Sequence, residues 1–268
     1  MARSVRFAFI ALCLGLCACP AARRARVPDG AVLLYDVAFS APEQALNEEV
    51  KVVEPQTVQP FPSKIPSTIF FGHPTVIAKL CGLEQQPVQL AVASATEGLE
   101  GLEFLLDQRY GRYHVELDLC VQQIDPPPLP AQALQVAVFL DVADAYALGF
   151  MTGGVLAIVD PNLHPETLTT PQPVGKFELR KPMHLSFDVD LEKQNWRIAV
   201  DGNTVYDAPL EATIPRAVRV MVRGNPTTAV AFDNFLIWGE HDLTPAGTTL
   251  TPPIAGPELP PPEAGPQK

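Results

Sequence analysis

The chain is poor in basic residues and has no basic stripe. Its 268 residues include 19 lysines and arginines against 30 aspartates and glutamates, which gives a formal net charge of −11 at pH 7. Nucleic-acid binding depends on clustered cations that release counterions from phosphates. The basic cluster here is short, Arg23, Arg24 and Arg26. We therefore expect no nucleic-acid partner.

Long apolar runs and metal-binding motifs are also lacking. A helix needs about 20 apolar residues to cross a bilayer, and no stretch after the first 20 positions approaches that length without a proline or a charge. The H-E-x-x-H, P-loop and G-x-S-x-G motifs do not occur. The five histidines have no metal-ligand spacing. We therefore expect neither a metal nor another cofactor.

Cysteine is rare, and three of the five cysteines lie within the first 19 residues. Basic residues open the chain, an apolar run follows from Phe7 to Leu16, and the box Leu16-Cys17-Ala18-Cys19 closes it. These are the parts of an export signal, and the box has the pattern of a bacterial lipoprotein cleavage site. We predict that residues 1–18 are a signal peptide and that lipid on Cys19 anchors the mature protein to the bacterial cell envelope.

A Gram-negative source would place this anchored chain in the outer membrane or on the cell surface. The alternative is an ordinary secretory signal that is cut nearer Ala21 or Ala22 and leaves Cys19 unmodified. In the lipoprotein interpretation, residues 19–31 form a basic tether. This tether either touches anionic head groups or is simply solvated.

The two remaining cysteines, Cys81 and Cys120, leave two alternatives open. In an oxidising compartment they can form one disulfide. They can equally lie apart as small buried residues, because the sequence does not give the distance between their Cα atoms.

Between its ends the chain is dominated by alternation of period two, which is typical of β-strands. From Tyr113 to Val121, apolar residues alternate with polar ones, and Met183 to Asp190 repeats the pattern. Asp201-Gly202 follows as a hairpin turn. Helical periodicity is weak, with short helices conceivable only at 42–50 and 94–101. We predict an all-β domain over residues 32–240, followed by a disordered tail over 241–268, where proline is frequent.

The order of these pieces resembles the concanavalin A-like lectin/glucanase superfamily, which includes laminin G-like domains. The resemblance rests on Leu34 to Phe39, the Tyr113 and His184 strands with their hairpin, and a closing Ala231-Phe232-Asp233-Asn234-Phe235. It implies a two-sheet antiparallel jelly-roll sandwich, in which carbohydrate or protein often binds on one sheet or at its rim loops. Function does not follow from fold alone.

The glucanases of that superfamily imply a test for catalysis. Their strand motif is Glu-x-Asp-x-Glu, and this chain has Glu116-Leu117-Asp118 followed by Leu119 and Cys120. The second catalytic glutamate is absent, so the sequence favours a protein without catalytic residues. A glycosidase, or an enzyme like 3-keto-disaccharide hydrolases, remains the alternative, and a purely structural envelope protein is another.

The candidate binding residues are polar positions on the two best-defined strands. They are His114, Glu116, Asp118, His184 and Asp188. If both strands belong to one sheet, these side chains form a polar patch that can accept hydrogen bonds from sugar hydroxyls, with Trp196 or Tyr206 as a stacking ring. The other interpretation is an ordinary solvated sheet face with Trp196 in the core. The predicted function is a membrane-anchored lipoprotein that binds a glycan or another envelope component.

Overall fold

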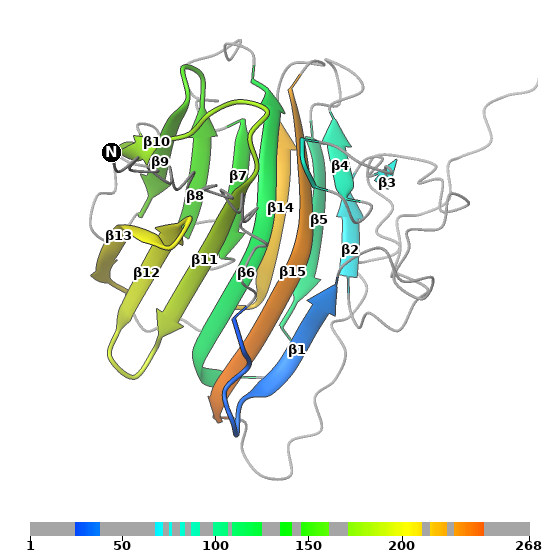
Figure 1. Ribbon diagram of the computed structural model, residues 1–268. Helices are drawn as coiled ribbons and strands as arrows, with labels where there is room; N and C mark the ends of the chain where they lie inside the picture. The colour runs from blue at the N-terminus through cyan, green and yellow to red at the C-terminus, as the bar shows by residue number, and fades with distance from the viewer. Residues whose placement is uncertain are drawn as a thin grey trace, which may run out of the picture.

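A computed structural model describes residues 25–37, 68–71, 75–76, 81–83, 87–91, 99–106, 109–124, 135–140, 146–160, 171–210, 215–223 and 228–243. In these ranges the protein is an all-β sandwich of two antiparallel sheets, a jelly-roll-like architecture (Figure 1). The predicted fold class is thereby confirmed. Within these ranges no helix is long and apolar enough to span a membrane.

Sheet A has eight strands, in the order β13-β12-β11-β6-β15-β4-β3, with β1 also paired to β15. Its strands are β1 (Val32–Val37), β3 (Thr75–Val76), β4 (Val88–Ala91), β6 (Tyr110–Gln123), β11 (Met183–Asp190), β12 (Asn195–Val200), β13 (Asn203–Pro209) and β15 (Ala229–Asp242).

Sheet B has seven strands, in the order β10-β9-β8-β7-β14-β5-β2. Its strands are β2 (Thr68–Phe71), β5 (Leu99–Leu105), β7 (Val136–Leu140), β8 (Tyr146–Met151), β9 (Val155–Val159), β10 (Gln172–Lys176) and β14 (Ala217–Arg223).

The hydrophobic core lies between the sheets and follows from the alternation in sequence. Leu117 on β6 and Phe187 on β11 are fully buried there, as is Trp196 on β12. Phe235 on β15 stacks on Phe104 of β5, with ring centroids 3.7 Å apart. The alternate residues of sheet A therefore point away from sheet B, onto what we term its outward face.

The long strand β6 is the centre of sheet A, between β11 and β15. The pairing of β6 with β11 is regular and places Asp188 opposite His114, Ser186 opposite Glu116, and His184 opposite Asp118. The pairing of β6 with β15 contains a bulge between Asp233 and Leu236. The extra residue lets Asn234 adopt a φ of 52°, a left-handed conformation that asparagine tolerates better than most residues.

A disulfide joins Cys81 to Cys120 on the outward face of β6, with the two Cα atoms 6.2 Å apart. That separation is typical of disulfides. Cys120 is fully buried and packs with Leu83 and Ala231. The bridge therefore attaches the segment before β4 to the middle of sheet A.

The sequence prediction erred in one segment and did not anticipate another strand. Residues 99–101 open strand β5 rather than ending a helix, because Leu102 and Phe104 of that strand are buried in the core, where Phe104 packs against Phe235 of sheet A. Gln172–Lys176 forms β10 although it contains Pro173 and Gly175, since β10 is an edge strand, where proline is tolerated. The predicted signal peptide, Cys19, the conceivable helix at 42–50 and residues 244–268 of the predicted tail lie outside the described residues. The predicted tail starts at residue 241, whereas strand β15 continues to Asp242.

Candidate functional site

The structure brings all five predicted binding residues together on the outward face of sheet A. His114, Glu116 and Asp118 come from β6, and His184 and Asp188 come from the adjacent strand β11. Side chains two residues apart share a face of a strand, and the antiparallel register sets the two groups side by side. We call these five residues the polar network.

His114 lies at one end of the network with both ring nitrogens occupied. Nδ1 is 2.6 Å from Asp188 Oδ1, and Nε2 is 2.9 Å from Glu116 Oε1. Both partners are carboxylates, which only accept hydrogen bonds, so both nitrogens of a protonated His114 can donate. The indole of Trp238 on β15 stacks on the imidazole, with centroids 4.6 Å apart and an interplanar angle of 17°.

His184 lies at the other end and contacts the second carboxyl group of β6. Its Nδ1 is 2.8 Å from Asp118 Oδ1, and its Nε2 is 3.8 Å from Glu116 Oε1. The bulge residue Asn234 donates its side-chain amide to Asp118 Oδ2 at 2.7 Å. Both oxygens of Asp118 are therefore hydrogen-bonded, and the bulge in β15 supplies one of the donors.

The centre of the network is buried, contrary to the expectation of a solvated sheet face. Only 4% of Glu116, 6% of Asp118 and 8% of His114 is exposed. The backbone N–H of Ala25 donates to Glu116 Oε2 at 2.9 Å, across 91 residues of sequence. Figure 1 shows the segment before β1 running across sheet A toward β6. Alternation predicts which face a side chain occupies, but a covering segment elsewhere in the chain decides whether water reaches it.

The exposed part of the network lies toward β12. Arg197 on β12 donates to Asp188 Oδ2 from two nitrogens, at 3.2 and 2.7 Å. The side chains of Arg197 and Asp188 are 50% and 36% exposed, and that of His184 is 22% exposed. We call Asp188, Arg197 and His184 the accessible edge of the network, because a ligand can reach them from solvent.

The surroundings of the histidines favour their protonated forms. Burial lowers the pKa of His114, but hydrogen bonds to Asp188 and Glu116 outweigh it and bring the pKa to about 9. The hydrogen bond to Asp118 and the nearby Glu116 carboxylate likewise raise the pKa of His184 to about 9, although burial opposes them. Both imidazoles therefore carry a positive charge at pH 7.

The carboxylates respond in the opposite direction. Burial raises the pKa of Glu116, yet hydrogen bonds from His114 and the Ala25 N–H, together with the nearby His184, hold that pKa well below its ordinary value. The pKa of Asp188 is also lowered, because the hydrogen bonds from His114 and Arg197 outweigh the effect of burial. Together with Arg197, the two imidazoles make three cations that face three carboxyl groups, so the network and Arg197 together are close to neutral.

Sequence reasoning did not place Asn234, Trp238 or Arg197 at this site. Trp238 lies opposite His114 on the outward face. The strand register alone could have revealed it, since β15 pairs with β6. The two suggested stacking rings are elsewhere: Trp196 is in the core, and the Tyr206 hydroxyl is 3.1 Å from Asp160 Oδ2. Within the described ranges no cluster of His, Cys, Asp and Glu is arranged to hold a metal.

No protein-family model matches the chain, and neither does any curated protein. Among solved structures, it is similar to Trypanosoma rangeli sialidase, with 12% identity, a TM-score of 0.49, and coverage of 81% of this chain and 32% of that one. It is also similar to domain 4 of AbnA, a GH43 extracellular arabinanase from Geobacillus stearothermophilus, with 12% identity, a TM-score of 0.45, and coverage of 81% and 96%.

The carbohydrate-binding module CBM66 from Bacillus subtilis has 14% identity and a TM-score of 0.38, with coverage of 62% and 91%. The chain spans only 16% of another sialidase and 43% of a botulinum neurotoxin binding domain. These similarities concern the β-sandwich and identify no ligand or reaction for this chain. Membership of the concanavalin A-like superfamily stays a prediction.

Proposed function

We propose that this protein is a lipid-anchored envelope protein whose β-sandwich is a non-catalytic module that binds carbohydrate or another hydroxyl-rich envelope component. The observation that carries the proposal is the accessible edge of the polar network. Asp188, Arg197 and His184 are open to solvent, and buried partners hold Asp188 and His184 in place. A fixed set of donors and acceptors is what recognition of a polar ligand requires.

The geometry of the edge suits sugar hydroxyls. Asp188 presents a carboxylate acceptor and Arg197 a planar fork of donors, and two neighbouring hydroxyls of a sugar can bond to such a pair. His114 holds the other oxygen of Asp188 at 2.6 Å. The carboxylate is therefore ordered before a ligand arrives, which lowers the entropy cost of binding.

The protonation pattern supports a module without catalysis. A retaining glycosidase needs one carboxylic acid with a raised pKa to protonate the leaving group. Glu116 has a lowered pKa and accepts hydrogen bonds on both oxygens. His114 has both nitrogens engaged and is protonated at neutral pH, so it offers no lone pair for a general base.

Glycan binding can be tested with a glycan array followed by calorimetry on the best ligand. We expect Asp188→Asn combined with Arg197→Gln to weaken binding by at least about tenfold, because two charge-assisted hydrogen bonds are lost. Arg223→Gln is the matched control, since Arg223 is an exposed arginine at the end of β14 in sheet B. No binding by the wild type, or equal binding by the double variant, would contradict the proposed site. If the wild type instead hydrolyses the ligand, and Glu116→Gln or Asp118→Asn abolishes this hydrolysis, the protein is an enzyme.

Lipidation is tested separately by growing cells on labelled palmitate. We expect the wild-type protein to carry the label and Cys19→Ser to lose it. The reason is that the lipid is attached through the thiol of Cys19, which serine lacks. If the wild-type chain is unlabelled and is recovered in the soluble envelope fraction, Cys19 is not lipidated and the export segment is an ordinary secretory signal.

A further inference from the structure

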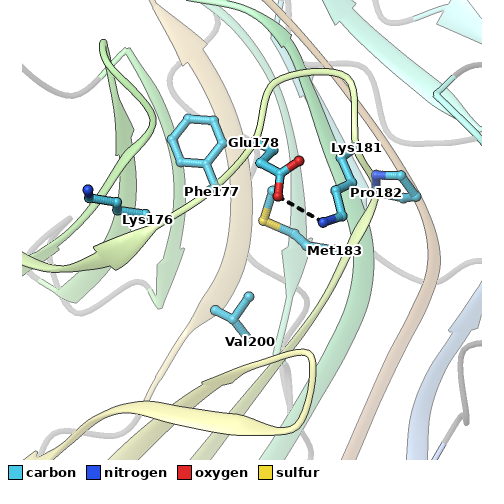
Figure 2. A pocket seen from close by; sticks show the side chains of 7 residues that line it. All are labelled: Lys176, Phe177, Glu178, Lys181, Pro182, Met183 and Val200. Carbon is cyan, nitrogen blue, oxygen red and sulfur yellow. Dashed lines mark hydrogen bonds and ion pairs between the residues drawn. The ribbon is translucent and has the colours of Figure 1, made fainter.

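A second site candidate is a hollow of about 320 Å³ at the sandwich edge where β10, β11 and β12 meet. Figure 2 shows its lining, which comes from the β10–β11 connection and the end of β12. None of the five residues of the polar network lines it. Its volume is at the lower end of the range of about 300–1,000 Å³ that small-molecule sites occupy.

The floor of the hollow is apolar and continuous with the core. Met183 is 6% exposed, and Phe177 and Val200 pack against the buried core cluster. The Phe177 ring contacts Phe150 of β8 edge to face, with centroids 5.3 Å apart. An apolar ligand group placed here would contact side chains from both sheets, at the edge of the space between them.

The rim of the hollow is charged and has an excess of cations. Lys181 Nζ forms an ion pair with Glu178 Oε1 at 2.9 Å, while Lys176 stands on the other side of Phe177 (Figure 2). No described side chain pairs with Lys176. Two ammonium groups and one carboxylate leave a net positive charge, in a chain whose formal charge is −11.

Backbone contacts hold the walls in a defined shape. The N–H of Phe177 donates to the Gly154 carbonyl at 2.8 Å, and the N–H of Arg180 donates to the Val121 carbonyl at 2.8 Å. Gly82, next to the disulfide, lies against Pro182, and a Cβ on Gly82 would be 3.5 Å from that ring. The β10–β11 connection is therefore attached to strand β6 and to two turns, which hold the walls of the hollow in place.

We propose that this hollow binds a small amphiphilic monoanion, an acyl chain or apolar ring that carries one carboxylate. The apolar part lies on Phe177, Met183 and Val200. The carboxylate lies between Lys176 and Lys181 and replaces Glu178 as the partner of Lys181. A neutral amphiphile gains only the floor contacts, and a cationic one meets two like charges, so the charge complementarity selects the anion. This site is separate from the proposed glycan site.

Octanoate, octanol and octylammonium are the probes that test the proposal, because they share one chain and differ in charge. Binding to the full mature chain is followed by calorimetry and by the methyl NMR signals of Met183 and Val200. We expect saturable octanoate binding, at least about tenfold tighter than that of octanol, and none of octylammonium. Lys176→Gln with Lys181→Gln is expected to reduce octanoate binding about tenfold, and Glu178→Gln to strengthen it, because a competing carboxylate is removed.

Lys193→Gln is the matched control, since Lys193 pairs with Asp190 in the β11–β12 turn, outside the hollow. Equal affinity for octanoate and octanol, or octanoate binding that survives the double lysine variant, would overturn the proposal. So would the absence of saturable octanoate binding. Asp188→Asn should leave octanoate binding unchanged, which makes failure at this hollow distinguishable from failure of the glycan site.

Discussion

Raising the pH from 6 to 10 is expected to lower the free energy of unfolding of this protein by about 3–5 kcal/mol. His114 and His184 have folded-state pKa values of about 9, against about 6.5 in an unfolded chain. The native state therefore binds more protons than the unfolded state between these values. The stabilisation is complete below about pH 6.5 and is lost as the pH rises through about 9.

The magnitude follows from linkage. A shift of about 2.5 pKa units corresponds to about 3.4 kcal/mol for one histidine. The two histidines share Glu116 as a partner, and His184 is partly exposed, so their contributions do not simply add. Urea denaturation at a series of pH values measures the effect directly.

Two variants separate the network from other groups that titrate in this range. Glu116→Gln removes the shared carboxylate, so it should both destabilise the protein at pH 7 and flatten the alkaline loss. His241→Gln is the control, because His241 is exposed and pairs only with the exposed Glu192 among the contacts that the structure describes. A wild-type stability that stays constant from pH 6 to pH 10 would show that the histidines are not protonated in the native state.

Removing the Cys81–Cys120 disulfide is expected to cost about 4 kcal/mol. The bridge spans 39 residues of sequence, and closure of a loop of that length lowers the entropy of the unfolded chain by an amount worth about 4 kcal/mol at 25 °C. For a domain of this size that should lower the melting temperature by about 10 °C. Thermal unfolding of Cys81→Ala with Cys120→Ala, compared with the wild type, measures the loss.

Reduction of the wild-type protein serves as the control, since it opens the Cys81–Cys120 bridge without changing any residue. A wild-type melting temperature that does not respond to a reducing agent, together with an unchanged double variant, would contradict a disulfide that stabilises the fold. Cys120 is fully buried beside Leu83 and Ala231. Alanine is therefore the chosen replacement, because serine would leave a hydroxyl without a hydrogen-bond partner there.

Period-two alternation was sufficient to predict the centre of sheet A. It placed His114, Glu116 and Asp118 on one face of a strand, and His184 and Asp188 on one face of another, which the register of β6 with β11 then sets side by side. Face assignment is local, because it depends only on the parity of the residue number. Which strands pair is not local, and the sequence supported it only through the resemblance to a known fold.

The surroundings of the network could not be predicted in the same way. The backbone N–H of Ala25, 91 residues earlier, donates to Glu116. Because every residue except proline has a backbone N–H, no residue type in the sequence signals this contact. Asn234 reaches Asp118 only because a bulge adds one residue to β15. Strands β3 and β4 were missed because two and four residues are too short to establish an alternation. Strand β10 was missed because it contains a proline and a glycine.

If Cys19 carries a lipid, as proposed, the hydrogen bond between Ala25 and Glu116 limits how far the domain can stand from the bilayer. Ala25 lies six residues after Cys19, and a fully extended chain covers at most about 3.6 Å per residue, or about 22 Å in all. A lipid on Cys19 would therefore hold the middle of sheet A within that height of the membrane surface. Ligands of the accessible edge would then be recognised in the layer next to the lipid head groups rather than far out in the envelope.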